Sequence, residues 1–282
     1  MVRIRKRIIM NYNNYIVYDY ETSSVSPYRT QPLSLGAVPI DGRRLEILDD
    51  VFYSLIKPIF DPEECKFYNL DPIQDEALEV NKLTREELET ALPLKLVWEQ
   101  FCHYINQYNC KKTKWTAPIA CYYNGLRFDQ IITDRIAGGQ NRHLKMLDEN
   151  LKSNIKNLIS AIKEDETIIK TDQLQELFKL STKLFTQNEC WGFGPWENNE
   201  CTLFHPRDSI DLMKMLFWWT ENLQEIRSIS LNSIREWLGI TTEGAHNAQK
   251  DVLDCAQILI RFLKYTRKHA INTKFAKSFK EL

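Results

Sequence analysis

The chain has 282 residues, and its 37 Lys and Arg side chains against 38 Asp and Glu leave a formal net charge of -1 at pH 7. Hydrophobic residues make up 43% and charged residues 27%, which is typical of a globular protein and excludes a disordered or fibrous chain. No apolar run approaches the ~20 residues that a membrane helix needs, so we expect no membrane segment and no membrane partner. A nearly neutral chain is also no general polycation, so any positive surface for nucleic acid must be local.

Cysteine usage and composition along the chain predict its setting and its organisation. Seven cysteines without CxxC spacing favour reduced thiols in a cytoplasmic protein. The apolar part of the basic stretch 1–10 is too short for a signal peptide. No linker composition interrupts the chain, so we expect one domain over 1–282, with a core at 15–265, a helical and irregular insertion at 140–207 and a basic tail at 266–282.

Three strands are predicted near the start of the chain. Aromatic and β-branched residues predict strands at 15–20, 33–40 and 51–56. The Asp41-Gly42 pair is a turn signal, so these strands are expected to form a meander.

A helical segment is predicted at 81–107, where apolar residues recur at helical spacing. Thr84 and Glu87 fit a capping box near its start. Because proline lacks the backbone donor that a helix interior requires, Pro93 is expected to divide the segment into two helices.

The second half of the chain is predicted to be mainly helical. A short strand at 118–123 is expected to end at Asn124-Gly125. The expected helices are 131–136, a helical stretch within 141–185, 208–219, 230–238 and the amphipathic 249–265, with an irregular stretch at 190–205. Strands, then strand–helix alternation, then helices indicate a mixed α/β fold in which helices cover a sheet.

Two carboxylates stand close together on the first predicted strand. Asp19 and Glu21 are two residues apart, and such residues point to the same face of a strand. Their charges repel unless a cation lies between them, and a hard divalent cation such as Mg²⁺ or Mn²⁺ prefers oxygen ligands. The alternative is a strand end at which both acids face water.

Three further polar residues occupy places where chemistry or ordinary helix capping would put them. Asp129 lies where a predicted strand turns into a helix, and Asp251 lies in the first turns of the last helix. Either acid could simply complement a helix dipole. His246 precedes the last helix in a glycine-containing loop. The ordinary pKa of a histidine, ~6.5, suits a general base, although a histidine in a surface loop more often has no catalytic role.

The order and context of these motifs resemble those of the DEDD exonucleases of the ribonuclease H-like fold, in the subgroup with a catalytic histidine. Within that family, the chain is similar in particular to the nuclease domain of exonuclease I. The resemblance rests on Asp19-Tyr20-Glu21-Thr22, on the stretch 123–129 with sequence YNGLRFD, and on Ala245-His246-Asn247-Ala248. It also covers 208–213 and 231–239, and in all spans roughly 15–265.

The resemblance implies a ribonuclease H-like mixed β-sheet flanked by α-helices, and a 3'→5' exonuclease that releases nucleoside 5'-monophosphates from single-stranded DNA. It implies that two ions of Mg²⁺ or Mn²⁺ are held by four carboxylates and that a histidine deprotonates the attacking water. The implied metal ligands are Asp19, Glu21, Asp129 and Asp251, the implied general base is His246, and the expected substrate contacts are Thr22, Asn124 and Arg127. A structural salt bridge is the alternative for Arg127.

Two other functions stay open at this point. The four acids do not sense a 2'-hydroxyl group, so an exoribonuclease or an oligonucleotide-degrading enzyme is the first alternative. A nucleic-acid-binding adaptor that keeps the fold without turnover is the second. The expected partner is a 3' end of single-stranded DNA or RNA, and a homodimer or a polymerase or repair partner stays open as well.

One further group of residues invites a metal interpretation. Cys190, Cys201 and His205 are zinc-ligand types, but their spacing lacks the paired pattern of structural zinc sites.

Overall fold

The computed structural model describes residues 13–137, 203–221, 223–243 and 247–272. His246, Cys190, Cys201 and the predicted helical stretch at 141–185 lie outside the described residues. None of the helices within the described ranges is long and apolar enough to cross a membrane.

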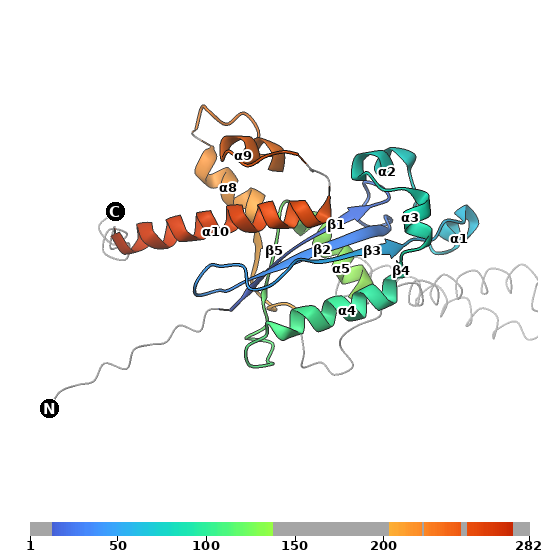
Figure 1. Cartoon of the computed structure of the whole chain (residues 1–282), viewed down its shortest axis with the longest axis horizontal. Coiled ribbons are helices and arrows are strands. Elements are labelled where there is room, and N and C mark those ends of the chain that lie inside the picture. The colour runs from blue at the N-terminus through green and yellow to red at the C-terminus, as the bar shows by residue number, and fades with distance from the viewer. Residues whose placement is uncertain (1–12, 138–202, 222, 244–246, 273–282) are drawn as a thin grey trace, which may run out of the picture.

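A six-stranded mixed sheet forms the centre of the molecule (Figure 1). Its first three strands are antiparallel neighbours, which confirms the predicted meander. β5 pairs with β1 and β6 pairs with β5, both in parallel, so the order is β4-β3-β2-β1-β5-β6. The strands are β1 (Tyr15–Thr22), β2 (Pro32–Ile40), β3 (Phe52–Lys57), β4 (Leu92–Pro93), β5 (Ile119–Tyr122) and β6 (Ser209–Asp211).

Within the described residues, most helices follow the predicted pattern, but α1 and α2 were not predicted. They are α1 (Pro62–Phe67), α2 (Asp75–Asn81), α3 (Arg85–Glu89), α4 (Leu94–Gln107), α5 (Asp129–Ala137), α8 (Leu212–Thr220), α9 (Leu231–Trp237) and α10 (Ala248–Asn272). The capping box is present at the start of α3, where Thr84 and Glu87 exchange hydrogen bonds. Pro93 is the N-cap of α4, so the division at this proline is confirmed.

The helix predicted at 208–219 begins later than its pattern indicates. Ser209–Asp211 form β6, and the helix begins at Leu212. The three-residue strand exists because its backbone pairs with β5, an interaction between segments that are far apart in the chain. Such a short strand has no periodicity of its own that a sequence pattern could show.

Alternate residues of β1 face two different hydrophobic cores. Ile16, Tyr18 and Tyr20 pack with α4 and α5 on one side of the sheet. Tyr15 and Val17 pack with α8, α9 and α10 on the other side. Figure 1 shows this arrangement, with α4 and α10 on opposite faces of the sheet. The period of two in a strand therefore decides which helices each side chain of β1 meets.

Candidate metal centre

The candidate site lies where the parallel strands end. β1 pairs with β5 only as far as Val17 opposite Cys121, so residues 18–22 extend beyond β5. β6 ends at the same edge with Asp211, which lies opposite Tyr122. Loops and helix starts converge at the carboxyl ends of parallel strands, and α/β proteins bind their ligands there. The polar residues at the end of β1 are therefore in the usual place for a site.

Asp19 and Glu21 share the face of β1 that α10 covers, as their spacing predicts. Asp251 in the first turn of α10 joins them. One carboxylate oxygen from each of the three residues lies within 4.8 Å of the other two. Each side chain is at least half-buried. Residues from the first strand and the last helix thus form one acidic cluster, here called the acidic triad.

A glycine of β2 lets α10 come close enough to complete the acidic triad. Gly36 is the register partner of Asp19 in the antiparallel pair of β1 and β2. A Cβ atom at this position would lie 2.6 Å from the backbone oxygen of Ala248, the first residue of α10. Gly36 was not identified from the sequence, although a glycine inside a strand is a known sign of close backbone approach.

Replacing Gly36 by Ala is expected to move the start of α10 and with it Asp251. The added methyl group meets backbone atoms, which cannot rotate away, so we expect a loss of roughly 1–3 kcal/mol in the free energy of unfolding. We also expect at least about tenfold weaker Mn²⁺ binding, as when the support of a metal ligand is lost. Urea denaturation and a Mn²⁺ titration measure the two effects.

Gly239 offers a matched control for this substitution. It has a positive φ of 68°, and a Cβ atom added there would meet no other atom within 4 Å, so Gly239→Ala strains the backbone without a collision. We expect it to destabilise the protein by about 1–2 kcal/mol while Mn²⁺ affinity stays at the wild-type level. Equal Mn²⁺ affinity for Gly36→Ala and Gly239→Ala would contradict the role of Gly36.

Two acids of the triad, Asp19 and Glu21, and the neighbouring Asp129 have raised pKa values. Burial raises the pKa of Asp19 well above its ordinary value, and the charges of Asp129, Glu21 and Asp251 raise it further. Burial, Asp251 and Asp129 together raise the pKa of Glu21 to about 7. Burial also raises the pKa of Asp129 to about 7, although hydrogen bonds from backbone amides oppose this shift. Negative charge is therefore crowded here beyond what the surrounding protein compensates.

The stability of the metal-free protein is expected to fall as the pH rises from about 4 to about 7. In this range the folded state holds protons on Glu21 and Asp129 that the unfolded state has already released, so raising the pH favours unfolding. Asp134, whose pKa burial raises to about 6, acts in the same direction. A divalent cation replaces those protons, so Mn²⁺ should raise the melting temperature more at about pH 8 than at about pH 5.

Thermal unfolding with chelator and with Mn²⁺ across this pH range is the measurement. A melting temperature that rises with pH in chelator, or a Mn²⁺ effect that is equal at both ends of the range, would contradict the expected charge crowding.

Asp129 occupies the first position of α5 and reaches back to β1. Its Oδ1 accepts a hydrogen bond of 3.1 Å from the backbone amide of Tyr20. The pairing of β1 with β5 ends at Val17, so β5 provides no backbone partner for this amide. Gly125 packs against the same carboxylate, because a Cβ atom there would lie 2.5 Å from Oδ2 of Asp129. Asp129 lies outside the acidic triad itself but influences the pKa of both Asp19 and Glu21.

The turn between β5 and α5 is held by a residue to which the sequence pattern assigned no role. Asp211, buried at the end of β6, accepts hydrogen bonds from the backbone amides of Asn124 (3.1 Å) and Leu126 (3.4 Å). Asn124 adopts a left-handed conformation in this turn, with φ of 61°. Asp211 therefore stabilises the turn that brings Asp129 to the site. Only its position at the end of a strand could have indicated this role, and that strand was predicted as helix.

The predicted substrate contacts and the described zinc candidate lie at the end of β1, on the turn before α5 and near β6. Thr22 lies at the end of β1 and donates its hydroxyl to the backbone oxygen of Ser24 at 3.0 Å. Asn124 and Arg127 are exposed on the turn before α5. His205, the described member of the zinc candidates, lies with Nδ1 3.1 Å from Oδ2 of Asp208.

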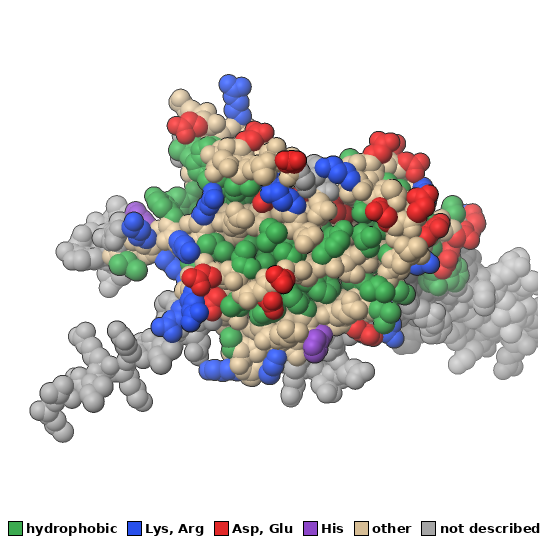
Figure 2. All heavy atoms as spheres, in the orientation of Figure 1, with side chains coloured by type: hydrophobic (Ala, Val, Ile, Leu, Met, Phe, Trp, Pro, Cys, Tyr) green, Lys and Arg blue, Asp and Glu red, His purple; other side chains and the backbone are tan. Residues whose placement is uncertain are grey.

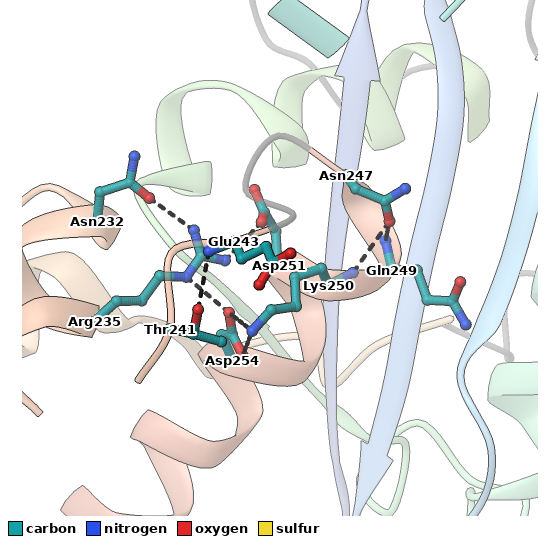
Figure 3. A network of polar contacts seen from close by, with 9 residues as sticks. All are labelled: Asn232, Arg235, Thr241, Glu243, Asn247, Gln249, Lys250, Asp251 and Asp254. Atoms are coloured by element: carbon teal, nitrogen blue, oxygen red, sulfur yellow. Dashed lines mark hydrogen bonds and ion pairs between the residues drawn. The ribbon is translucent and has the colours of Figure 1, made fainter. Parts of the chain in front are cut away.

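A buried arginine stands behind the acidic triad, and it was not identified from the sequence. Arg235 of α9 is 1% exposed and lies with Nη2 2.6 Å from Oδ1 of Asp251 (Figure 3). Its Nε also lies 2.8 Å from Oδ2 of Asp254, one turn further along α10. No local pattern indicates these pairs, because Arg235 and Asp251 are on different helices.

The acidic triad fits a hard divalent cation. Its donors are carboxylate oxygens only, which Mg²⁺ and Mn²⁺ prefer to sulfur or imidazole ligands. Oxygens on opposite sides of an octahedral Mg²⁺ are roughly 4.2 Å apart, so a separation within 4.8 Å requires only small movements. Burial and the neighbouring carboxylates raise the pKa of Asp19 and Glu21, and a bound cation would offset both effects by stabilising their ionised forms.

Three solved structures with a similar fold are of nucleases. Cell-death related nuclease 4 matches with a TM-score of 0.54 at 15% identity, over 90% of this chain and 64% of its own length. Exonuclease I matches with a TM-score of 0.51 at 15% identity, over 91% of this chain and 44% of its own. E. coli exonuclease I in complex with a dT13 oligonucleotide matches with a TM-score of 0.52 at 15% identity, over 93% of this chain and 43% of its own length.

The chain thus spans about two fifths of the length of the exonuclease I structures and slightly under two thirds of the length of cell-death related nuclease 4. No protein-family model and no curated protein sequence matches it. The likeness therefore lies in the fold, and it covers most of the chain.

Proposed function

We propose, from the premise that this chain has the exonuclease I-like nuclease fold, that it is a metal-dependent 3'→5' exonuclease acting on single-stranded DNA. The observation that carries the proposal is the convergence of Asp19, Glu21 and Asp251, with Asp129 beside them. Cations bound at this edge of the sheet would explain why four carboxylates are crowded there, because they would offset the repulsion between the carboxylates. A dT13 oligonucleotide bound to a structural neighbour supports a single-stranded DNA substrate.

The carboxylates would hold two divalent cations, which supply positive charge to the attacking and leaving oxygens during phosphodiester hydrolysis. In this proposal Asp19, Glu21 and Asp251 are the ligands of one cation, and Asp129 contributes to the second. His246, two residues before the start of α10, accepts the proton of the attacking water. Burial at the triad excludes bulk water, which strengthens each of these interactions.

The chain's own surface charges favour one direction of approach for the substrate. Figure 2 shows acidic side chains gathered over α1, α2 and α3 at one end of the molecule. α2 lies next to the end of β1, where the side chain of Asn81 donates a hydrogen bond of 3.1 Å to the backbone oxygen of Thr22. Because these helices repel phosphate groups, we propose that the strand avoids them and approaches the site past the exposed Asn124 and Arg127.

A degradation time course tests the function. Single-stranded DNA, duplex DNA and RNA of one sequence, each labelled at the 5' end, are incubated with Mg²⁺ or with chelator. We expect a ladder that shortens from the 3' end on single-stranded DNA, and no products with chelator. A ladder on RNA alone would indicate an exoribonuclease, and no ladder on any substrate would indicate a binding protein. Cleavage that continues in chelator would refute the metal assignment.

A further inference from the structure

Arg235 contacts Asp251 of the acidic triad directly. It belongs to a polar network between α9 and α10, which Figure 3 shows. Asp251 and Asp254 are three residues apart on α10, so their side chains lie on one face of the helix. The guanidinium group of Arg235 bridges the two carboxylates, with Nη2 on Asp251 and Nε on Asp254. Its Nη1 donates to Oδ1 of Asn232 at 2.8 Å. All three nitrogens of the group therefore have a partner.

The charges of this network balance before any metal binds. Lys250 lies with Nζ 2.7 and 2.6 Å from the two oxygens of Asp254, so this buried carboxylate has two cationic partners. Arg235 and Lys250 together neutralise Asp251 and Asp254. Asp254 consequently adds no uncompensated negative charge to the acidic triad, and Arg235 is held in place from the side away from the triad.

We propose that Arg235 is a positioning residue of the metal centre, which fixes the carboxylate of Asp251 so that it offers a single oxygen toward Asp19 and Glu21. Arg235 takes one of the two acceptor positions of Oδ1 of Asp251, so Oδ2 is the less encumbered oxygen for a cation. Asp254 and Asn232 hold the guanidinium in the plane that this contact requires. This inference rests on the proposed function, because it assumes that Asp251 binds a divalent cation.

Arginine suits this role better than lysine because of its shape. Its planar group presents several donors in a rigid fork, whereas a lysine ammonium is a point charge at the end of a flexible chain. A lysine at position 235 could pair with one carboxylate but could not hold two carboxylates and an amide at the observed positions.

The test separates positioning from stabilisation by removing the buried pair as a whole. The double variant Arg235→Met/Asp254→Asn removes the two fully buried charges together. The partners left behind, Asp251 and Lys250, carry opposite charges and are partly exposed (14% and 27% of the side chain), so we expect the variant to fold with a moderately lowered melting temperature. We expect its Mn²⁺ affinity, measured by electron paramagnetic resonance of free Mn²⁺, to be 10- to 100-fold lower, as for loss of a residue that orients a metal ligand. Wild-type affinity in the double variant would overturn the inference.

A second variant covers the case in which the double variant does not fold. Arg235→Lys keeps a cation at this position, and we expect at least about tenfold weaker Mn²⁺ binding because the fork is lost. Wild-type affinity in Arg235→Lys would also overturn the inference. Arg267→Met is the matched control, because Arg267 contacts backbone oxygens of Gly42 and Arg43 about 24 Å further along α10. Its Mn²⁺ affinity should equal that of the wild type.

Asp251→Asn distinguishes failure of this inference from failure of the proposed function. If Asp251→Asn weakens Mn²⁺ binding while the Arg235 variants do not, only the role of Arg235 is wrong. If Asp251→Asn binds Mn²⁺ as tightly as the wild type, the metal site itself is wrong and the proposed function fails with it.

Discussion

Replacing Asp19 by Asn is expected to abolish exonuclease activity while the protein stays folded. The amide retains the shape of the side chain but loses the charge that a divalent cation requires. The loss should exceed the roughly 100-fold cost of removing a residue that merely orients a ligand. Stability should change in the opposite direction. Because burial and the charges of Asp129, Glu21 and Asp251 disfavour the ionised form of Asp19, the metal-free variant should be at least as stable as the wild type at neutral pH.

The degradation time course on 5'-labelled single-stranded DNA measures the activity, and thermal unfolding in chelator measures the stability. Asp134→Asn is the matched control, because burial also raises the pKa of Asp134, which lies on α5 outside the acidic triad. We expect this control to retain activity within a few-fold of the wild type. Full activity in Asp19→Asn would refute the metal assignment, and a large loss of stability would show that the carboxylate serves the fold instead.

Replacing His246 by Ala is expected to lower turnover by about 10²–10⁴, the usual range for loss of a general base. Mn²⁺ binding should be unchanged, because the four carboxylates remain. In the wild type, the rate should rise with pH as the imidazole loses its proton near its ordinary pKa of ~6.5. When Mn²⁺ is saturating, so that Glu21 and Asp129 are deprotonated throughout, the variant should lack this rise.

Single-turnover rates across the pH range, together with a Mn²⁺ titration, measure these effects. His103→Ala serves as the control, because His103 is exposed on α4, on the face of the sheet opposite α10. A loss smaller than about tenfold for His246→Ala, or a pH profile with the wild-type shape, would exclude His246 as the base.

Much of the fold could be predicted because the relevant signals are local. The aromatic and β-branched residues of 15–20 predicted a strand, and the structure has β1 there. The Thr84–Glu87 capping box and the division at Pro93 depend on contacts between residues that are close in the chain, and both are present. The orientation of Asp19 and Glu21 to one face follows from strand geometry alone. The order of the motifs indicated a nuclease fold, which the solved structures confirm.

The amino-acid sequence by itself thus determined β1, β2, β3 and β5, most of the helices and the identity of the acidic residues, because backbone preference and side-chain periodicity act over a few residues. Only the tertiary structure decided how these residues meet. β6 exists through its pairing with β5, α10 approaches β1 because Gly36 has no side chain, and Arg235 and Asp211 find partners on other elements. Each of these depends on register and packing between distant segments, and no local pattern of residues encodes such contacts.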